Sequence, residues 1–144
     1  MTTTSSWLYW ALLSAVFAAL TAIFAKVGLE SVDSDLATLI RTVVIMWVLS
    51  CFVFFAGKWT NPFQLSPKTW SFLILSGLAT GASWVCYFRA LQVGEASKVA
   101  PVDKFSLVLV SVFAFTFLDE RPSVREWIGI LMIAGGVLLL AIRR

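Results

Sequence analysis

Histidine is absent from this sequence, and charged residues of every kind are scarce. Asp, Glu, Lys and Arg together make up 13% of the 144 residues, while 60% are hydrophobic. A soluble domain typically has roughly 25% charged and 45–50% apolar residues. Both deviations point the same way, and they indicate that a lipid bilayer rather than water surrounds most of the chain.

The residue patterns that usually carry enzyme or metal chemistry are also missing. Without histidine, the chain lacks the side chain most often used for proton transfer and metal binding. The two cysteines, Cys51 and Cys86, fall in different apolar segments at different depths, so we expect neither a disulfide nor a metal site. No paired carboxylates lie inside the apolar segments, and an enzyme is therefore the weakest alternative. We predict no cofactor and no metal.

The net charge is weakly basic, at +3, but the basic residues do not cluster. They are spread over the ends of the apolar segments, as expected for charges that flank a membrane. A nucleic-acid surface needs a basic patch, so we predict no nucleic-acid partner. Residues 1–6 contain no Lys or Arg before the first apolar run, which favours a retained span over a signal peptide.

Long apolar runs are the dominant feature of the chain. A helix needs about 20 mostly apolar residues to cross a bilayer, and five segments meet this length. The alternation expected of a membrane β-barrel is missing. We predict an all-α integral membrane protein of the cell membrane, with residues 1–144 forming a single five-helix domain. The spans are expected at about 7–25, 36–56, 69–92, 97–118 and 124–142.

Small residues recur within the third and fifth segments. Helices associate in lipid through close packing of small side chains, because no hydrophobic driving force acts between them there. Gly77 and Gly81 form a Gly-x-x-x-Gly pair, and Gly129 precedes the pair Gly135-Gly136. We interpret these five glycines, together with Pro101 in the fourth segment, as helix-packing positions.

Five ionisable residues lie inside the apolar segments or at their edge: Lys26, Arg41, Arg89, Asp103 and Lys104. Each ionised group in hydrocarbon costs an estimated ~2.5–3.5 kcal/mol on insertion scales. If consecutive spans alternate in direction, all five fall in the same leaflet. Four different spans contribute to this charged layer, and the stretch from Tyr87 to Lys104 joins two of them.

The charged layer has two interpretations. In the first, the basic side chains reach the nearby membrane surface, and Asp103 pairs with Arg89 or Arg41. In the second, the ionic groups line a water-filled pathway for a solute. Four cations against one anion favour an anionic or zwitterionic solute, unless lipid phosphates occupy the site. The predicted pathway comprises Lys26, Arg41, Trp84, Tyr87, Arg89, Asp103 and Lys104.

The flanking charges bear on topology, because Lys and Arg counts set the orientation of membrane proteins. Each side has four flanking cations when Arg41, Arg89 and Lys104 are left out, and Arg143 and Arg144 are among those counted. Adding the three makes it seven against four. A weak bias permits insertion in both orientations. Five helices are few to enclose a solute, so we predict an inverted, antiparallel homodimer with dual topology.

The sequence from Tyr87 to Leu91, followed by Gly94 to Pro101, resembles the third-to-fourth helix passage of the EamA-type unit of the drug/metabolite transporter superfamily. The resemblance covers essentially the whole chain. Pro101 matches a proline early in the fourth helix, and Glu120 matches an acidic residue after it. The remaining matches are Arg41 entering the second helix and Gly129, Gly135 and Gly136 in the last.

This resemblance implies a secondary transporter of small metabolites, amino acids or lipid-linked intermediates that works by alternating access. Most members carry two such units in one chain, so dimerisation has to be inferred here. Asp103 and Lys104 replace what is usually an apolar stretch, so the substrate is not carried over. The alternative function is a lipid-carrier flippase subunit or an accessory membrane scaffold, whose cations would hold lipid phosphates.

Overall fold

The structure is a computed structural model, and it describes residues 4–142. Within that range the regular structure is helical, with no strand, and five helical segments are long and apolar enough to cross a membrane. Arg143 and Arg144, counted above among the flanking charges, lie outside the described residues. The helices are α1 (Thr4–Gly28), α2 (Ser34–Phe55), the 3₁₀ turn η1 (Pro62–Gln64), α3 (Pro67–Val93), α4 (Ala96–Asp103), α5 (Ser106–Phe117) and α6 (Val124–Ala141).

Side-chain caps explain where several helices begin. The Asp33 carboxylate accepts hydrogen bonds from the backbone N–H groups of Asp35 and Leu36 at the start of α2. At the start of α6, Ser123 and Glu126 form a reciprocal capping box. These caps satisfy backbone donors that a helix start leaves without an intrahelical partner.

The end of α2 depends on one glycine. Gly57 has a φ of +63°, and its N–H donates to the carbonyl of Phe54 while the N–H of Lys58 donates to that of Val53. These two hydrogen bonds form a Schellman motif. Glycine is favoured at this position because a residue with a side chain is strained at positive φ. The turn redirects the chain toward η1 and α3.

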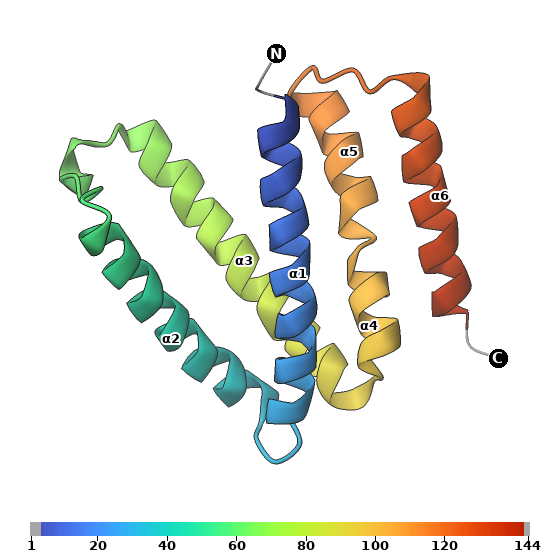
Figure 1. Ribbon diagram of the computed structural model, residues 1–144, viewed down its shortest axis with the longest axis horizontal. Helices are drawn as coiled ribbons and strands as arrows, with labels where there is room; N and C mark the ends of the chain where they lie inside the picture. The colour runs from blue at the N-terminus through green and yellow to red at the C-terminus, as the bar shows by residue number, and fades with distance from the viewer. Residues whose placement is uncertain (1–3, 143–144) are drawn as a thin grey trace. The chain divides into compact units, whose positions relative to one another are not determined.

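The fourth predicted span, 97–118, is not one continuous helix. It remains a single membrane-crossing segment, Ala96–Phe117, but it consists of α4 and α5 with an interruption at Lys104 and Phe105 (Figure 1). Across the interruption the N–H groups of Lys104 and Phe105 donate to carbonyls three residues back instead of four. Pro101 lies inside α4, where its ring removes one backbone donor.

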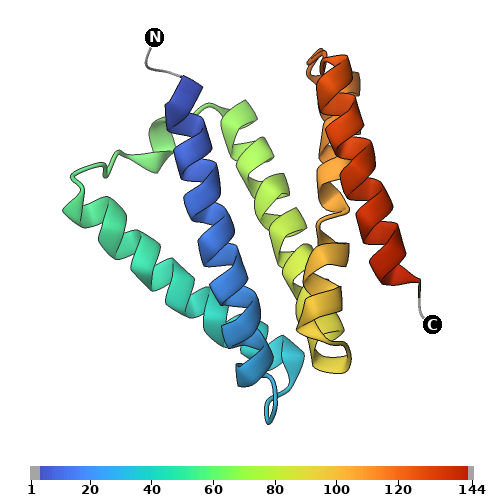
Figure 2. The same ribbon diagram turned by 45° about the vertical axis from the view of Figure 1, so that its right-hand side comes forward.

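The chain divides into two compact units. The first, here the α2–α3 unit, comprises Phe24–Val93 and therefore includes the last turn of α1. Its helices α2 and α3 run antiparallel and pack on each other (Figures 1 and 2). Its most buried side chains are Leu29, Ser34, Thr38, Phe88 and Leu91, which lie around the start of α2 and the end of α3.

The second unit, here the α4–α6 unit, comprises residues 1–23 and 94–144. In it α6 packs along both α4 and α5 (Figures 1 and 2). The rings of Phe115 and Trp127 meet edge to face at 6.2 Å, and Val137 is buried. The prediction of a single domain over the whole chain stays a prediction.

The five glycines interpreted as packing positions meet no close neighbour. A Cβ added at Gly77, Gly81, Gly129, Gly135 or Gly136 would find no atom within 4 Å among the described residues. Within each unit, therefore, no second helix packs tightly on these glycines. Their predicted role in helix packing stays a prediction and would need a partner from outside the unit.

We predict that Gly57→Ala destabilises the protein in detergent, because alanine is strained at the positive φ of this residue. The expected loss in the free energy of unfolding is about 1–2 kcal/mol. Gly28→Ala is the matched control, since Gly28 is helical and an added Cβ there also meets open space. The control should be neutral or stabilising by less than ~1 kcal/mol. Equal effects in thermal unfolding would contradict the assignment of strain to Gly57.

Candidate functional site

The predicted pathway residues divide between the two units. Lys26, Arg41, Trp84, Tyr87 and Arg89 belong to the α2–α3 unit, and they gather around the last turns of α3. Asp103 and Lys104 belong to the α4–α6 unit, at the interruption between α4 and α5. The site is therefore built here as two separate groups.

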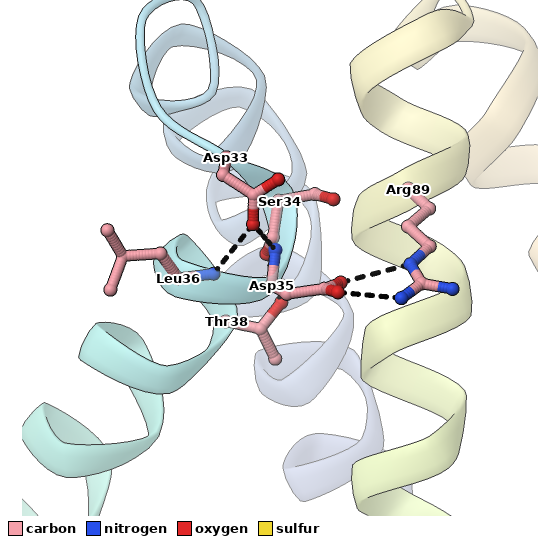
Figure 3. A network of polar contacts seen from close by, with 6 residues as sticks. All are labelled: Asp33, Ser34, Asp35, Leu36, Thr38 and Arg89. Atoms are coloured by element: carbon pink, nitrogen blue, oxygen red, sulfur yellow. Dashed lines mark hydrogen bonds and ion pairs between the residues drawn. The ribbon is translucent and has the colours of Figure 1, made fainter.

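An ion pair between two helices dominates the first group. The Arg89 guanidinium donates from Nε to Asp35 Oδ1 at 3.0 Å and from Nη2 to Asp35 Oδ2 at 2.6 Å (Figure 3). This two-point contact matches the fork of arginine to a carboxylate and fixes the relative orientation of both groups. Asp35 lies in the first turn of α2 and Arg89 in the last turns of α3, so the pair joins one end of the antiparallel helices.

This pairing differs from the expectation of an Asp103–Arg89 or Asp103–Arg41 pair. Arg89 has Asp35 as its partner, and the Asp103 carboxylate instead lies 3.3 Å from the Lys104 ammonium. The reason is the packing of α2 on α3, which brings the start of one helix to the end of the other. The second span was predicted to begin at residue 36, so Asp35 fell just outside it and was not predicted as a partner of Arg89. The available signal was an acid in the first helical turn, on the same predicted membrane side as Arg89.

Two further bonds close the same end of the α2–α3 unit through backbone carbonyls. Lys26 Nζ donates to the Leu91 carbonyl at 2.7 Å, and Gln92 Nε2 donates to the Val32 carbonyl at 3.2 Å. The last carbonyls of a helix have no intrahelical partner, and a basic side chain can satisfy them. Lys26 therefore holds the last turn of α1 against the end of α3.

Two buried hydroxyl residues lie behind the ion pair. Thr38 Oγ1 donates to the Ser34 carbonyl at 2.7 Å, and both residues are buried at the start of α2. Figure 3 labels both of them beside Asp35. This hydrogen bond lies within α2, so the buried Thr38 hydroxyl has its partner in the same helix. Neither residue was singled out from the sequence, because Ser and Thr near a helix start usually serve only as caps.

Arg41 is half-buried and packs against aromatic rings of α3. Its Cζ lies 4.5 Å from the centroid of the Trp84 ring and 5.0 Å from that of Phe88. Trp84, Tyr87 and Phe88 follow a spacing of three and four, so they share one face of α3. Tyr87 also lies close enough to interact with the Arg41 charge. Cation–π contacts of this kind stabilise a guanidinium that is partly removed from water.

The second group consists of two neighbouring charges at a helix interruption. Asp103 ends α4 and Lys104 follows it, and their side chains are 36% and 51% exposed. Non-helical backbone at membrane depth is tolerated where protein covers it or where it lines a cavity. In many transporters such broken helices carry the groups that bind substrate and coupling ions.

Metal and disulfide chemistry find no support in the part of the chain that the structure describes. Residues 4–142 contain no group of three His, Cys, Asp or Glu side chains able to hold a metal ion. Cys51 and Cys86 are free thiols.

The model of the EamA-like transporter family matches residues 5–142 of this chain. The chain belongs to this family. The resemblance to an EamA-type unit is thereby confirmed, as is the all-helical fold with five membrane-crossing segments. Membership of a transporter family, together with these segments, makes the chain an integral protein of the cell membrane and points to a transporter rather than an enzyme.

Three relatives illustrate the proteins to which this chain is similar. A Sinorhizobium sp. protein, named an uncharacterized transporter in the cobO 3′ region, is 56% identical over 95% of this chain and 97% of its own length. The Bacillus subtilis transporter YxxF is 26% identical over 96% of this chain but only 43% of its own length. A Yersinia pestis protein, named a probable 4-amino-4-deoxy-L-arabinose-phosphoundecaprenol flippase subunit ArnE, is 30% identical over 51% of this chain and 64% of its own length. No solved structure shows a significant match.

We predict that Asp35 and Arg89 stabilise this EamA-family chain as a pair. Asp35→Arg and Arg89→Asp should each lower the melting temperature in detergent, because each places two like charges together. The double variant, which swaps the charges, should recover most of the loss. The control is the Lys98–Glu95 pair, which is similarly exposed but lies within one helix start. Reversing Lys98 or Glu95 should have a smaller effect, and a swap that fails to recover stability would contradict the pairing.

Proposed function

We propose that this chain is a secondary transporter that moves a small anionic or zwitterionic metabolite across the cell membrane by alternating access. The observation that carries the proposal is the Asp103–Lys104 pair at the interruption of a membrane-crossing helix. Charges inside a span are costly, so they are retained there mainly where they act on a solute, an ion or a partner. Membership of a transporter family favours the first of these roles.

The proposed mechanism uses the interruption between α4 and α5 as the solute-contacting element. Asp103 and Lys104 offer one negative and one positive group, which suits a zwitterion or an anion whose charge is read by Lys104. Both side chains are partly exposed, so a solute could reach them and compete for their mutual contact. Alternating access would then expose this element first to one side of the membrane and then to the other.

We further propose that two copies pair in opposite orientations. The glycines at 77, 81, 129, 135 and 136 face open space within their units, as expected if a second copy packs there. The matched region makes up 43% of the B. subtilis relative, which therefore has room for two such units. Larger transporters are often built from inverted repeats, and an inverted pair would reproduce that arrangement.

A flippase subunit is the second candidate function. The observation in its favour is the likeness of half of this chain to a protein named as an ArnE flippase subunit. In this role the cations of the charged layer would hold the phosphate of a lipid carrier, and the working partner would be a different chain.

We predict that Lys104→Ala and Asp103→Ala impair transport by the purified protein in liposomes. Uptake should be measured for a mixture of radiolabelled amino acids and organic acids. Loss of either charge should reduce uptake of the transported solute about tenfold, which corresponds to ~1.4 kcal/mol for one charged contact. Lys98→Ala is the control, because Lys98 is an exposed cation paired locally with Glu95. Normal uptake by both correctly folded variants would remove the basis of the proposal.

Native mass spectrometry distinguishes the two candidate functions. A transporter of the proposed kind should appear as a homodimer with no obligatory lipid. A flippase subunit should retain an anionic lipid or associate with a second, different chain when the membrane extract is purified gently. A stable monomer that binds neither would contradict both the homodimer and the flippase assignment.

A further inference from the structure

We infer that Arg41, packed on the Trp84 and Phe88 rings of α3, forms a binding subsite for an oxyanion, either a carboxylate or a phosphate. The inference deepens the proposed function and rests on it, because it assigns the group of the α2–α3 unit that would read the negative charge of the ligand. It is independent of Asp103 and Lys104, which belong to the other unit.

The cations of the α2–α3 unit differ in the hydrogen-bond acceptors that surround them. Arg89 donates twice to the Asp35 carboxylate, and Lys26 donates to the Leu91 carbonyl. Arg41 contacts the rings of Trp84 and Phe88, but none of the described residues offers its guanidinium a hydrogen-bond acceptor. A guanidinium carries five N–H donors, and an aromatic ring offsets its charge without accepting ordinary hydrogen bonds.

Arg41 lies deeper in the second span than Asp35 does. It lies six residues beyond Asp35, or about 9 Å farther along the helix axis, inside the apolar part of the span. Neither of its neighbours in sequence, Ile40 and Thr42, provides a carboxylate. A partly buried cation without an acceptor at this depth is costly, so the arrangement favours a ligand that brings its own oxygens.

The guanidinium and the rings beside it indicate the chemical class of the ligand. The planar fork of arginine matches carboxylates and phosphates, which accept two parallel hydrogen bonds. The half-buried ring of Trp84 lies next to the guanidinium, and it offers an apolar surface for the part of the ligand that follows the oxyanion. Phe88 is only 2% exposed, so it contacts the guanidinium but leaves almost no surface for a ligand. The ligand is thus an oxyanion with an attached apolar or aromatic group.

Binding to the full-length purified protein in a neutral detergent tests this inference without any transport step. The probes are inorganic phosphate and benzoate, and the readouts are calorimetric affinity and the rise in melting temperature. Wild type should bind at least one probe saturably, and Arg41→Gln should weaken that binding at least tenfold. Arg41→Lys, which keeps the charge but loses the fork, should fall between them. Lys98→Gln, which removes an exposed cation of the other unit, should bind as wild type.

A second arm distinguishes a free solute from a lipid headgroup. Wild type and Arg41→Gln are placed in nanodiscs of phosphatidylcholine alone or with phosphatidylglycerol. If lipid phosphate is the ligand, phosphatidylglycerol should block the probe in wild type and should co-purify with wild type but not with Arg41→Gln. If a solute is the ligand, the probe should bind equally in both nanodiscs. Either result supports the subsite.

The inference is overturned if Arg41→Gln and Arg41→Lys are folded and bind both probes and the anionic lipid as wild type does. It is also overturned if wild type binds neither probe and retains no anionic lipid. Failure of the proposed function gives a different result: the Lys104 and Asp103 variants would leave transport unchanged, or no solute would move, while Arg41 still binds oxyanions. Normal transport by Arg41→Gln would contradict only the subsite.

Discussion

A charged side chain inside a bilayer needs a partner, and this requirement organises the α2–α3 unit. Lipid cannot solvate a guanidinium, an ammonium or an open helix end, so each must be satisfied by other parts of the protein. Arg89 meets the requirement with a carboxylate, Lys26 with a backbone carbonyl and Arg41 with aromatic rings. The three solutions differ in one respect, since among the described residues only the rings leave the N–H donors of their cation without an acceptor.

The same requirement gives the interruption between α4 and α5 its significance. A continuous helix satisfies its backbone internally, whereas bonds to carbonyls three residues back mark a local departure from that pattern at Lys104 and Phe105. Asp103 and Lys104 place two charges next to this change in the hydrogen-bond pattern. In the mechanism proposed above, they would exchange their mutual contact for contacts with a solute.

Family membership and local geometry contribute different kinds of knowledge. The match over residues 5–142 establishes a transporter family, but the three relatives described differ in length, and only one of the three has a name that says what it acts on. Substrate class must therefore come from the side chains of this chain. Arg41, Asp103 and Lys104 lie inside the spans and, unlike Arg89, form no ion pair with a second helix among the described residues. They underlie both the proposed function and the proposed subsite.

The membrane class, the helical fold and the number of spans follow from the sequence alone. They depend on the length and composition of each apolar run, which is local to one segment of the chain. Which side chains meet does not follow from the sequence, because contacts such as that of Arg89 with Asp35, 54 residues apart, depend on the register of two packed helices. The acceptor of Lys26 is a backbone carbonyl, which has no signature in the sequence. The interruption after Asp103 could not be predicted from the sequence either, because a helix can continue past Pro101, as α4 does.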